Sequence, residues 1–275
     1  MMQKRLRDWR LEIKRLEIEM TSTKKKSATP KPTRAKSPTL RQPQDAVSNL
    51  QSPNLQSLRR KAKSIHEQLL KIYGKPQWTK LDGVSELVST ILSQNTNDGN
   101  RDLAYARLRA RFAKWEDVRD VKAELVIEAI KPAGLANQKG PRIQKALKRI
   151  SEERGELNID FLSKLPMQAA KAWLLSINGI GPKTTAIVLL FCYGMPAFPV
   201  DTHVHRVTGR LGLRDEKLSA DDTHDLMEQI TPKGAEGPFH LNLIRHGREI
   251  CHARNPECGR CPLQRSCDYY QALVK

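Results

Sequence analysis

Two short stretches of this sequence combine residue types and spacings that can support chemistry. The first, "INGIGPKTT" (177–185), places two glycines, a proline and Lys183 in close succession. The second, "CHARNPECGRCPLQRSC" (251–267), holds four cysteines. A lysine can attract a phosphate with its charge or act as a nucleophile through its free amine, and clustered thiolates bind metals. The elements around each stretch decide between these uses.

The lysine stretch lies within "LLSINGIGPKTTAIVLL" (174–190), a pattern that predicts a helix, a Gly-x-Gly turn and a second helix. Such a turn exposes backbone N–H groups, here those of Gly179, Ile180 and Gly181. Together with the positive end of the second helix, these groups can hold a DNA phosphate without reading the base sequence. The pattern also fits a plain corner between two helices, in which the glycines supply positive φ angles.

Lys183 falls in the first turn of the second helix. The helix dipole and a half-buried setting both disfavour an ammonium there, which favours the neutral amine and hence a nucleophile. Eighteen residues further on, in "FPVDTHVHR" (198–206), Asp201 follows an apolar run and is placed to cap the next helix. A capping role and a catalytic role for this carboxylate are compatible.

The cysteines follow the pattern Cys251-x6-Cys258-x2-Cys261-x5-Cys267. Thiolates at these intervals in one short loop can close a tetrahedral zinc site or hold a [4Fe–4S] cluster, and the spacing alone leaves both open. Disulfides are less favoured because few cysteines are present for a secreted scaffold of this size. Cys192 lies in an apolar run and is expected to be a small buried hydrophobe.

The chain of 275 residues carries a formal net charge of +18. Residues 1–50 hold 13 Lys and Arg against 5 Asp and Glu, so +8 lies there and +10 lies on the remainder. A strongly basic body indicates a polyanionic partner, most simply nucleic acid, although a solvated basic surface kept for solubility is the alternative. No apolar run reaches 18 residues, so we expect no membrane association.

The composition of the N-terminal region also indicates where the protein is located in the cell and which residues are disordered. The N-terminus lacks the apolar core of a secretory signal, which predicts a cytoplasmic, nucleoid-associated location. Residues 21–52 are rich in Ser, Thr, Pro and Lys and poor in large apolar side chains, so we expect residues 1–55 to form a basic, disordered arm. A true translation start at Met20 is an alternative for this segment.

Apolar spacing predicts helices along the rest of the chain. Leu58, Ala62, Ile65, Leu69 and Ile72 form the stripe of the first. The expected helices cover residues 58–72, 82–95, 101–112, 115–119, 122–131, 139–153, 159–164, 167–176, 182–193, 219–230 and 237–250, with a further helix starting at Asp201. No segment shows strand alternation beside hairpin turn residues, so the fold is predicted to be all-α.

The combination of these motifs resembles the endonuclease III family of DNA glycosylases, within the helix-hairpin-helix glycosylase superfamily. The likeness rests on the hairpin ending in Gly-Pro-Lys, the Val-Asp-Thr-His segment and the cysteine pattern, and runs from about residue 58 to 270. Further matching pieces are "ILSQNTND" (91–98), "IKPAGLANQK" (130–139) and "HGREIC" (246–251). The basic arm lies outside the resemblance.

The resemblance implies a bifunctional enzyme of base excision repair. Lys183 matches the family's Schiff-base lysine and Asp201 its catalytic aspartate, and the four cysteines match the ligands of a [4Fe–4S] cluster. The enzyme is expected to be a monomer that binds double-stranded DNA with damaged bases or abasic sites. It would flip the base out, remove it and nick the strand by β-elimination.

The resemblance also implies an architecture of two helical domains with the active site in the cleft between them. A helical barrel, residues 76–194, would carry the hairpin. Residues 56–75 would join residues 195–275 in a domain that holds the cluster.

The presence of a lysine and of four cysteines narrows the expected specificity. Monofunctional relatives generally lack a lysine at this position, and the 8-oxoguanine branch usually lacks the cluster. Oxidised pyrimidines such as thymine glycol are therefore the expected lesions. The rival hypotheses are a sister specificity for mismatches, uracil or 8-oxoguanine, and a non-catalytic DNA-binding protein with a structural zinc.

Other residues are candidates for DNA contacts. Gln94 and Asn95 both lie where family members insert a side chain into the gap left by the flipped base. Lys139 could hold a phosphate or lie on a solvated surface, and His203 could contact DNA or be a surface or core histidine. Arg254 is one of the cations left in a cysteine loop that is less basic than in the best-known members.

Overall fold

The computed structural model describes residues 52–274, so the basic arm predicted over residues 1–55 lies outside them except for its last four residues. Regular structure in the described residues is entirely helical, which confirms the predicted all-α fold. The α-helices are α2 (Ser52–Tyr73), α3 (Gly83–Ser93), α4 (Asp98–Arg111), α5 (Trp115–Asp120), α6 (Ala123–Ile130), α7 (Ala136–Arg154), α8 (Met167–Leu175), α9 (Pro182–Ile187), α10 (Thr202–Arg210), α11 (Ala220–Ile230), α12 (Glu236–Glu249) and α13 (Asp268–Leu273). None of the described helices is both long and apolar enough to cross a membrane.

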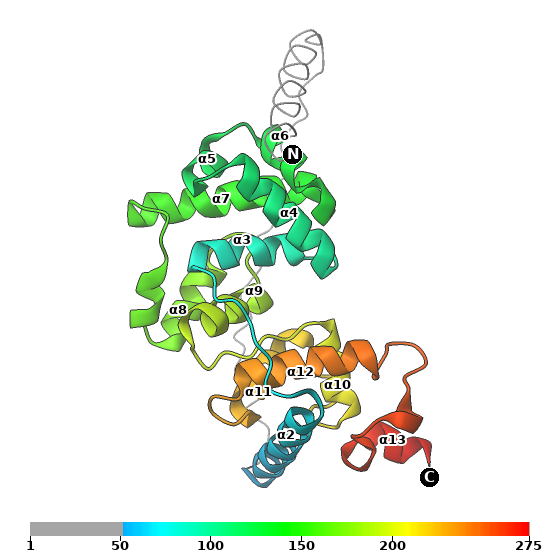
Figure 1. The fold of residues 1–275 in the computed structure, drawn as a ribbon. Coiled ribbons are helices and arrows are strands. Elements are labelled where there is room, and N and C mark those ends of the chain that lie inside the picture. Colours follow the sequence, from blue (N-terminus) through cyan, green and yellow to red (C-terminus); the bar gives the residue numbers. More distant parts are fainter. Residues whose placement is uncertain (1–51, 275) are drawn as a thin grey trace, which may run out of the picture. The chain divides into compact units, whose positions relative to one another are not determined.

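The apolar face of α2 is buried only in its middle. Ala62, Ile65 and Leu69 expose no surface, whereas Leu58 is half-buried and Ile72 is 38% exposed. Intervals of three and four residues put the three buried side chains on one side of the helix. α2 packs with these turns against α11 and α12, which lie beside it in Figure 1 although they come much later in the sequence.

Side-chain caps fix the starts of α3 and α4. Asp82 accepts a hydrogen bond from the Ser85 amide at 2.9 Å, and Asn97 accepts one from the Asn100 amide at 2.9 Å. Each cap satisfies an amide that the first turn of a helix leaves without a partner. The chain between these helices therefore leaves α3 and enters α4 at defined points.

The first of two hydrophobic cores lies among α3 to α9. Its large side chains are contributed mainly by α3, α4, α6 and α7, each at helical spacing. Those with no exposed surface include Leu87, Ile91, Leu92, Leu108, Ile130, Ile143 and Leu147.

The second core joins α2 to the C-terminal part of the chain. Its buried members include Ala62, Ile65, Leu69, Phe198, Val204, Val207, Leu213, Phe239, Leu243 and Leu263. We propose that the two cores belong to the two predicted domains, 76–194 and 56–75 with 195–275. Residues 74–82 and 193–201 connect the helices of one core to those of the other.

The connection that precedes α10 is tied down by buried polar groups. His224 donates to the Phe198 carbonyl at 2.8 Å, and His240 donates to the Pro199 carbonyl at 2.9 Å. The Phe198 amide donates to Glu228 at 3.3 Å. Because these partners come from α11 and α12, the backbone leading to Asp201 is fixed from two sides.

Candidate functional site

The predicted hairpin connects α8 to α9. The side chains of Ile177 and Ile180 are buried, and the Ile180 amide donates to the Ile177 carbonyl at 3.0 Å. Gly179 between them has a φ of +85°, a conformation that side chains with a Cβ rarely adopt. Gly181 precedes α9 and its carbonyl accepts from the Thr185 amide at 3.0 Å. Two buried isoleucines thus anchor the turn, while glycines form its bend. Because the Ile180 N–H is bonded within the turn, the prediction that it holds a phosphate is not supported for this group.

Lys183 is the second residue of α9 and is half-buried. The α-helix is short, and from Val188 to Cys192 the chain continues as a π-helix rather than as the regular helix predicted over 182–193. Single π-helical turns inside helices occur frequently at functional sites. The wider turn rotates the side chains that follow it relative to those of α9.

Asp201 caps α10, as its position predicts. Its Oδ1 accepts from the Val204 amide at 2.7 Å, while no described residue donates to Oδ2. The half-buried carboxylate therefore has one oxygen engaged in capping and a second available to a substrate. The two interpretations of this residue are compatible in the structure.

His240 connects the two candidate catalytic residues electrostatically. Burial lowers the pKa of its imidazole to about 4, so the ring is neutral near pH 7. The negative charge of Asp201 opposes this shift and the positive charge of Lys183 adds to it. Both charges therefore act on the same buried side chain, although they lie in different helices.

Asp98 and Arg248 form a contact between α4 and α12 that the sequence analysis did not single out. Arg248 on α12 donates to Asp98 on α4 at 2.7 Å, and Arg101 donates to the same carboxylate at 3.3 Å. Burial alone would raise the pKa of Asp98, but Arg248, Arg101 and Lys183 lower it overall. An acidic residue at a helix start gives no signal of a partner 150 residues away.

The two candidates for the flipped-base gap have different surroundings. Gln94 is half-buried, and its side-chain oxygen accepts from the guanidinium of Arg142 on α7. Asn95 is exposed and has a φ of +52°. The side chain of Gln94 is thus held by Arg142, whereas that of Asn95 is exposed.

Lys139 corrects one expectation. Only 1% of its surface is exposed, and its ammonium donates to the carbonyls of Leu92 and Ala133 at 2.8 and 2.7 Å. Burial, with a smaller effect from Arg142, lowers its pKa. A lysine in this position is neither a phosphate contact nor a solvated surface residue, because its charge is occupied within the core.

Leu135, four positions before Lys139, is a further candidate that the sequence motifs did not indicate. Leu135 precedes α7 with a φ of +49°, and 48% of its surface is exposed. A strained conformation at an exposed apolar side chain marks a candidate contact site. Nothing in the sequence distinguishes it from any other leucine near a glycine.

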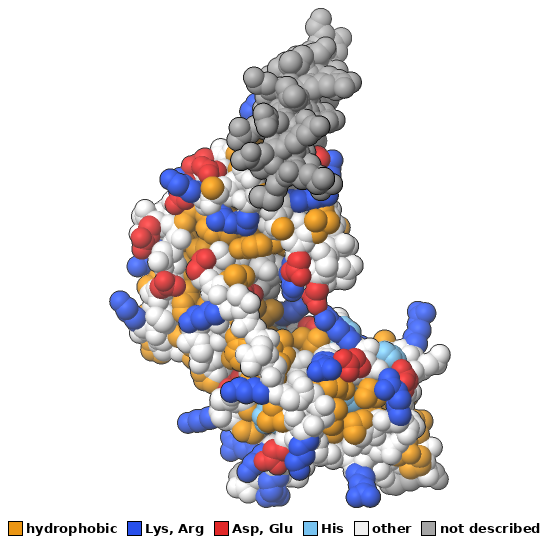
Figure 2. Space-filling view, in the orientation of Figure 1, with side chains coloured by type: hydrophobic (Ala, Val, Ile, Leu, Met, Phe, Trp, Pro, Cys, Tyr) orange, Lys and Arg blue, Asp and Glu red, His pale blue; other side chains and the backbone are white. Residues whose placement is uncertain are grey.

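The remaining predicted DNA contacts lie near the cysteine loop. His203 is half-buried and pairs with Arg206 at 3.1 Å, and burial lowers its pKa despite the nearby charge of Asp201. Arg254 is exposed. Glu257 instead pairs with Arg260, which reduces the positive charge available on this loop. Figure 2 shows Lys and Arg side chains spread over the drawn face rather than gathered in one patch.

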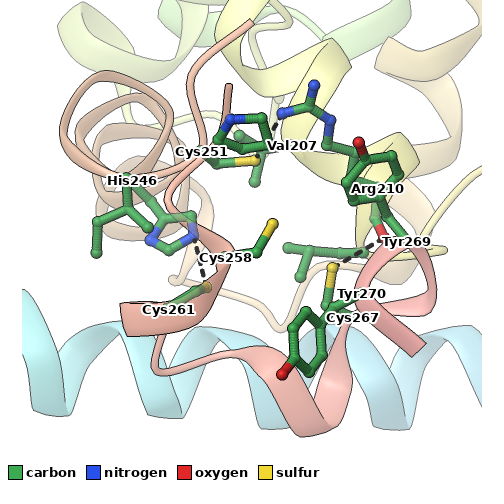
Figure 3. A pocket seen from close by; sticks show the side chains of 12 residues that line it. Val207, Arg210, His246, Cys251, Cys258, Cys261, Cys267, Tyr269 and Tyr270 are labelled. Atoms are coloured by element: carbon green, nitrogen blue, oxygen red, sulfur yellow. Dashed lines mark hydrogen bonds between the residues drawn. The ribbon is translucent and has the colours of Figure 1, made fainter. Parts of the chain in front are cut away.

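The four clustered cysteines line one pocket between α10, α12 and the C-terminal loop. All are free thiols, and Figure 3 shows the sulfurs of Cys251, Cys258 and Cys267 directed toward a common space, with that of Cys261 beside His246. Among the described residues, no three Cys, His, Asp or Glu side chains are grouped as a site for a single metal ion. Four cysteine sulfurs around a shared pocket fit the ligand set of an iron–sulfur cluster.

Hydrogen-bond donors surround these sulfurs. Arg210 donates to the Cys251 sulfur at 3.3 Å, and His246 Nε2 lies 3.6 Å from the Cys261 sulfur. The other imidazole nitrogen lies 3.0 Å from the hydroxyl of Tyr73, whose pKa is raised to about 12 by burial and by Glu249. With the Cys261 sulfur as a thiolate ligand, which can only accept, Nε2 carries the proton and Nδ1 accepts from the Tyr73 hydroxyl. Donors to sulfur are what stabilises thiolate ligands of a cluster.

Two family models match this chain. The model described as the HhH-GPD superfamily base excision DNA repair protein matches residues 88–233, and that of the iron–sulfur binding domain of endonuclease III matches residues 251–267. The first contains the hairpin, Lys183 and Asp201. The second begins and ends on the outer two of the four cysteines.

Individual proteins agree with these models. The endonuclease III of Thermotoga maritima is 32% identical over 189 residues, which cover 69% of this chain and 84% of that protein. The endonuclease III of Sulfolobus acidocaldarius is 32% identical over 191 residues, or 69% and 83% of the two chains. A solved structure of a trapped endonuclease III–DNA covalent intermediate is similar with a TM-score of 0.69 at 25% identity, covering 79% of this chain and 99% of that one.

The family resemblance inferred from the motifs is thereby confirmed. The matched cysteine segment, its pocket and its sulfur-directed donors also fit the predicted cofactor. The chain belongs to the HhH-GPD superfamily of base excision DNA repair proteins, as a DNA glycosylase/AP lyase of the endonuclease III type with a [4Fe–4S] cluster domain.

Proposed function

We propose that this enzyme removes damaged bases through a covalent intermediate on Lys183 and then nicks the strand. The observation that carries the proposal is the half-buried lysine at the start of α9 together with Asp201, whose Oδ2 is not engaged by the described residues. The charges of both residues act on His240. The similarity to a trapped endonuclease III–DNA covalent intermediate supports a covalent route.

The first chemical step is displacement of the base. The Lys183 amine, once deprotonated, attacks C1′ of the flipped nucleotide, so that an N–C1′ bond forms and the glycosidic bond breaks. The electron pair of the glycosidic bond leaves with the base, which takes up a proton. Asp201 Oδ2 is the group available to stabilise the positive charge that develops on the sugar.

The second step cleaves the strand. Opening of the sugar ring converts the C1′ adduct into an imine between Lys183 and C1′. Loss of a proton from C2′ then expels the 3′ phosphate with its electron pair, which is β-elimination. Water hydrolyses the imine and releases the lysine.

The four thiolates of Cys251, Cys258, Cys261 and Cys267 would hold the [4Fe–4S] cluster beside α10 and α12. When bound, the cluster supplies a covalent cross-link of the C-terminal loop and a centre capable of electron transfer. Arg210 and His246 direct hydrogen bonds to two of its sulfur ligands. None of the steps above passes through it.

DNA engagement follows from the exposed residues near the hairpin. Asn95 and Leu135 are both exposed and both have positive φ angles, which suits side chains that project from the surface. Polar and apolar side chains that enter a duplex separate stacked bases and fill the space that a flipped nucleotide leaves. We propose that Asn95 rather than Gln94 fills the gap, because Arg142 already binds Gln94.

The proposed substrates are duplex DNA with oxidised pyrimidines, of the thymine glycol type, or with abasic sites. We also propose that the enzyme acts as a monomer in the cytoplasm, at the nucleoid. A panel of duplexes that carry thymine glycol, uracil, 8-oxoguanine or a mismatched thymine tests the substrate class. Highest kcat/KM on any lesion other than an oxidised pyrimidine would overturn that assignment.

Borohydride trapping tests the nucleophile. Reduction of the imine with lesion-containing duplex should yield a covalent protein–DNA complex with the wild-type enzyme and none with Lys183→Gln. DNA binding by that variant should remain within a few-fold of wild type. Lys164→Gln replaces an exposed lysine and is the matched control, expected to trap normally. Trapping by Lys183→Gln would show that another amine is the nucleophile.

Two substitutions at Asp201 separate its roles. Asparagine caps a helix about as well as aspartate, so Asp201→Asn should retain stability and lose most activity. Asp201→Ala should lose about 1 kcal/mol of stability as well, because the Val204 amide loses its partner. Wild-type cleavage by Asp201→Asn would reduce Asp201 to a capping residue.

A further inference from the structure

Two strained turns lie on either side of a buried lysine. Asn95 and Leu135 have φ angles of +52° and +49°, and among the described non-glycine residues only Asn255 is also in the left-handed region. The carbonyl of Leu92, three residues before Asn95, accepts a hydrogen bond from Lys139 at 2.8 Å. The carbonyl of Ala133, two residues before Leu135, accepts another at 2.7 Å.

The Lys139 side chain joins two backbone segments at the cost of burying a positive charge. Lys139 exposes 1% of its surface, so its ammonium is largely removed from water, and this desolvation lowers its pKa. Without this ammonium the carbonyls of Leu92 and Ala133 would both lose their donor. The buried lysine therefore fixes two backbone segments relative to each other through a single group.

The next turn of α7 extends the same arrangement. Arg142 donates to the side-chain oxygen of Gln94 and lies against Gly179 of the hairpin. The beginning of α7 thus contacts three segments that precede or form exposed turns: 92–95, 133–135 and the hairpin. Of Lys139 and Arg142, only Lys139 donates hydrogen bonds to backbone carbonyls in two of these segments, 92–95 and 133–135.

We propose that Lys139 is a positioning residue that fixes the separation of the two strained turns, so that Asn95 and Leu135 enter the duplex together. The inference rests on the proposed function, because it assumes that these two side chains meet DNA. Lys139 acts through them and touches neither the substrate nor the reacting atoms. Its loss should impair opening of the base stack and leave the chemistry at Lys183 intact.

The test compares two substrates with the full-length, cluster-containing enzyme. An abasic site in a duplex requires the stack to be opened, whereas the same site in a single-stranded oligonucleotide does not. Lys139→Met preserves the length of the side chain and removes its donors. Because a misplacement of about 1 Å can cost up to about a hundredfold in rate, we expect single-turnover cleavage of the duplex to fall about tenfold or more. Cleavage of the single strand should stay within about twofold.

Coupling to the two turns gives a second readout. In a background of Asn95→Ala and Leu135→Ala, the additional effect of Lys139→Met on the duplex should disappear, since the side chains it positions are gone. Lys145→Met removes an exposed lysine from the same helix and is the control, expected to match wild type on both substrates. If Lys139→Met does not accumulate as folded protein, Lys139→Gln, which removes the ammonium and shortens the side chain, replaces it under the same criteria.

The outcomes separate the two proposals. A wild-type enzyme that cleaves neither substrate would refute the lyase function itself. A wild-type enzyme that cleaves both, combined with equal losses on duplex and single strand for the Lys139 variant, would refute the positioning role alone. Full additivity of Lys139→Met with the Asn95 and Leu135 substitutions would refute it as well.

Discussion

Gly179→Ala tests how the hairpin is held against α7. With a φ of +85°, an alanine at this position is strained, and its Cβ would lie 2.5 Å from both Cδ and Nε of Arg142. These atoms lie in the middle of the arginine side chain, so the guanidinium must move and release Gln94. The substitution therefore combines backbone strain with the loss of a hydrogen bond between two other residues.

Gly155→Ala separates the two contributions. Gly155 ends α7 with a φ of +75°, and a Cβ there would meet no atom within 4 Å. It should cost only the backbone strain, about 1–2 kcal/mol for a residue in the left-handed region. Gly179→Ala should cost the same strain plus about 1.5–3 kcal/mol for the hydrogen bond from a charged donor. The predicted difference between the two variants is thus about 1.5–3 kcal/mol.

Urea unfolding followed by circular dichroism measures both changes in the free energy of unfolding. Repeating Gly179→Ala in an Arg142→Ala background should remove the difference, because the space for the Cβ is then open. Equal losses for Gly155→Ala and Gly179→Ala would mean that Arg142 does not constrain the turn in solution. An excess loss that persists without Arg142 would refute the steric explanation.

Three further predictions concern other parts of the chain. Glu228→Gln should lower the free energy of unfolding by roughly 3 kcal/mol, measured by thermal or urea unfolding. The substitution leaves the nearly buried Lys171 ammonium, 2.6 Å from Glu228, without its main counter-charge. An equal loss for Glu67→Gln on the surface would contradict this explanation. Burial lowers the pKa of His240 from 6.5 to about 4, so between these pH values the unfolded chain binds more protons than the folded one, and stability should fall as the pH drops from 6.5. His240→Gln should reduce this pH dependence of stability by up to about 1.4 kcal/mol per pH unit. An unchanged slope would exclude His240 as its source. Cys261→Ala should lower the iron content and the visible absorbance of the purified protein. Cys192→Ala is the control and should leave both unchanged, because this thiol is buried and its pKa is raised to about 12 by burial. Equal effects of the two substitutions would show that the four-cysteine assignment is wrong.

Local patterns account for the parts of the structure that the sequence predicted. The all-α fold and most helices follow from apolar residues at intervals of three and four. The cysteine pocket is formed largely by one short segment, so its ligands are predictable from spacing. The Asp201 cap depends only on the residues of its own helix start.

The apolar period of α7 places Lys139 on the buried face of the helix. Ile143, Ala146 and Ile150 are buried on one face of α7, and Lys139 precedes Ile143 by four residues and so lies on that face. The expectation of an exposed lysine came from its charge, which outweighed the pattern. Helix α7 was also predicted to begin three residues too late, because Leu135 gives no capping signal.

Long-range pairs were beyond the reach of local patterns. Arg142 meets Gln94 across 48 residues, and Arg248 meets Asp98 across 150. Arg142, Asp98 and Arg248 lie on helices rich in charged residues and Gln94 follows α3, so only the packing of the helices selects each partner. The same holds for His240, whose relation to Lys183 and Asp201 depends on three separate elements.

The packing of α2 has a consequence for how the protein is made. Its buried face contacts α11 and α12, and Tyr73 at its end pairs with His246 173 residues later. At roughly 5–20 residues per second, α2 leaves the ribosome roughly 10–30 s before its partners do. The helices of the first core can assemble during this interval, while the apolar stripe of α2 still lacks its partners α11 and α12. Ribosome-bound chains stalled before α11 should therefore remain sensitive to protease within α2, and protection before α12 emerges would contradict this order.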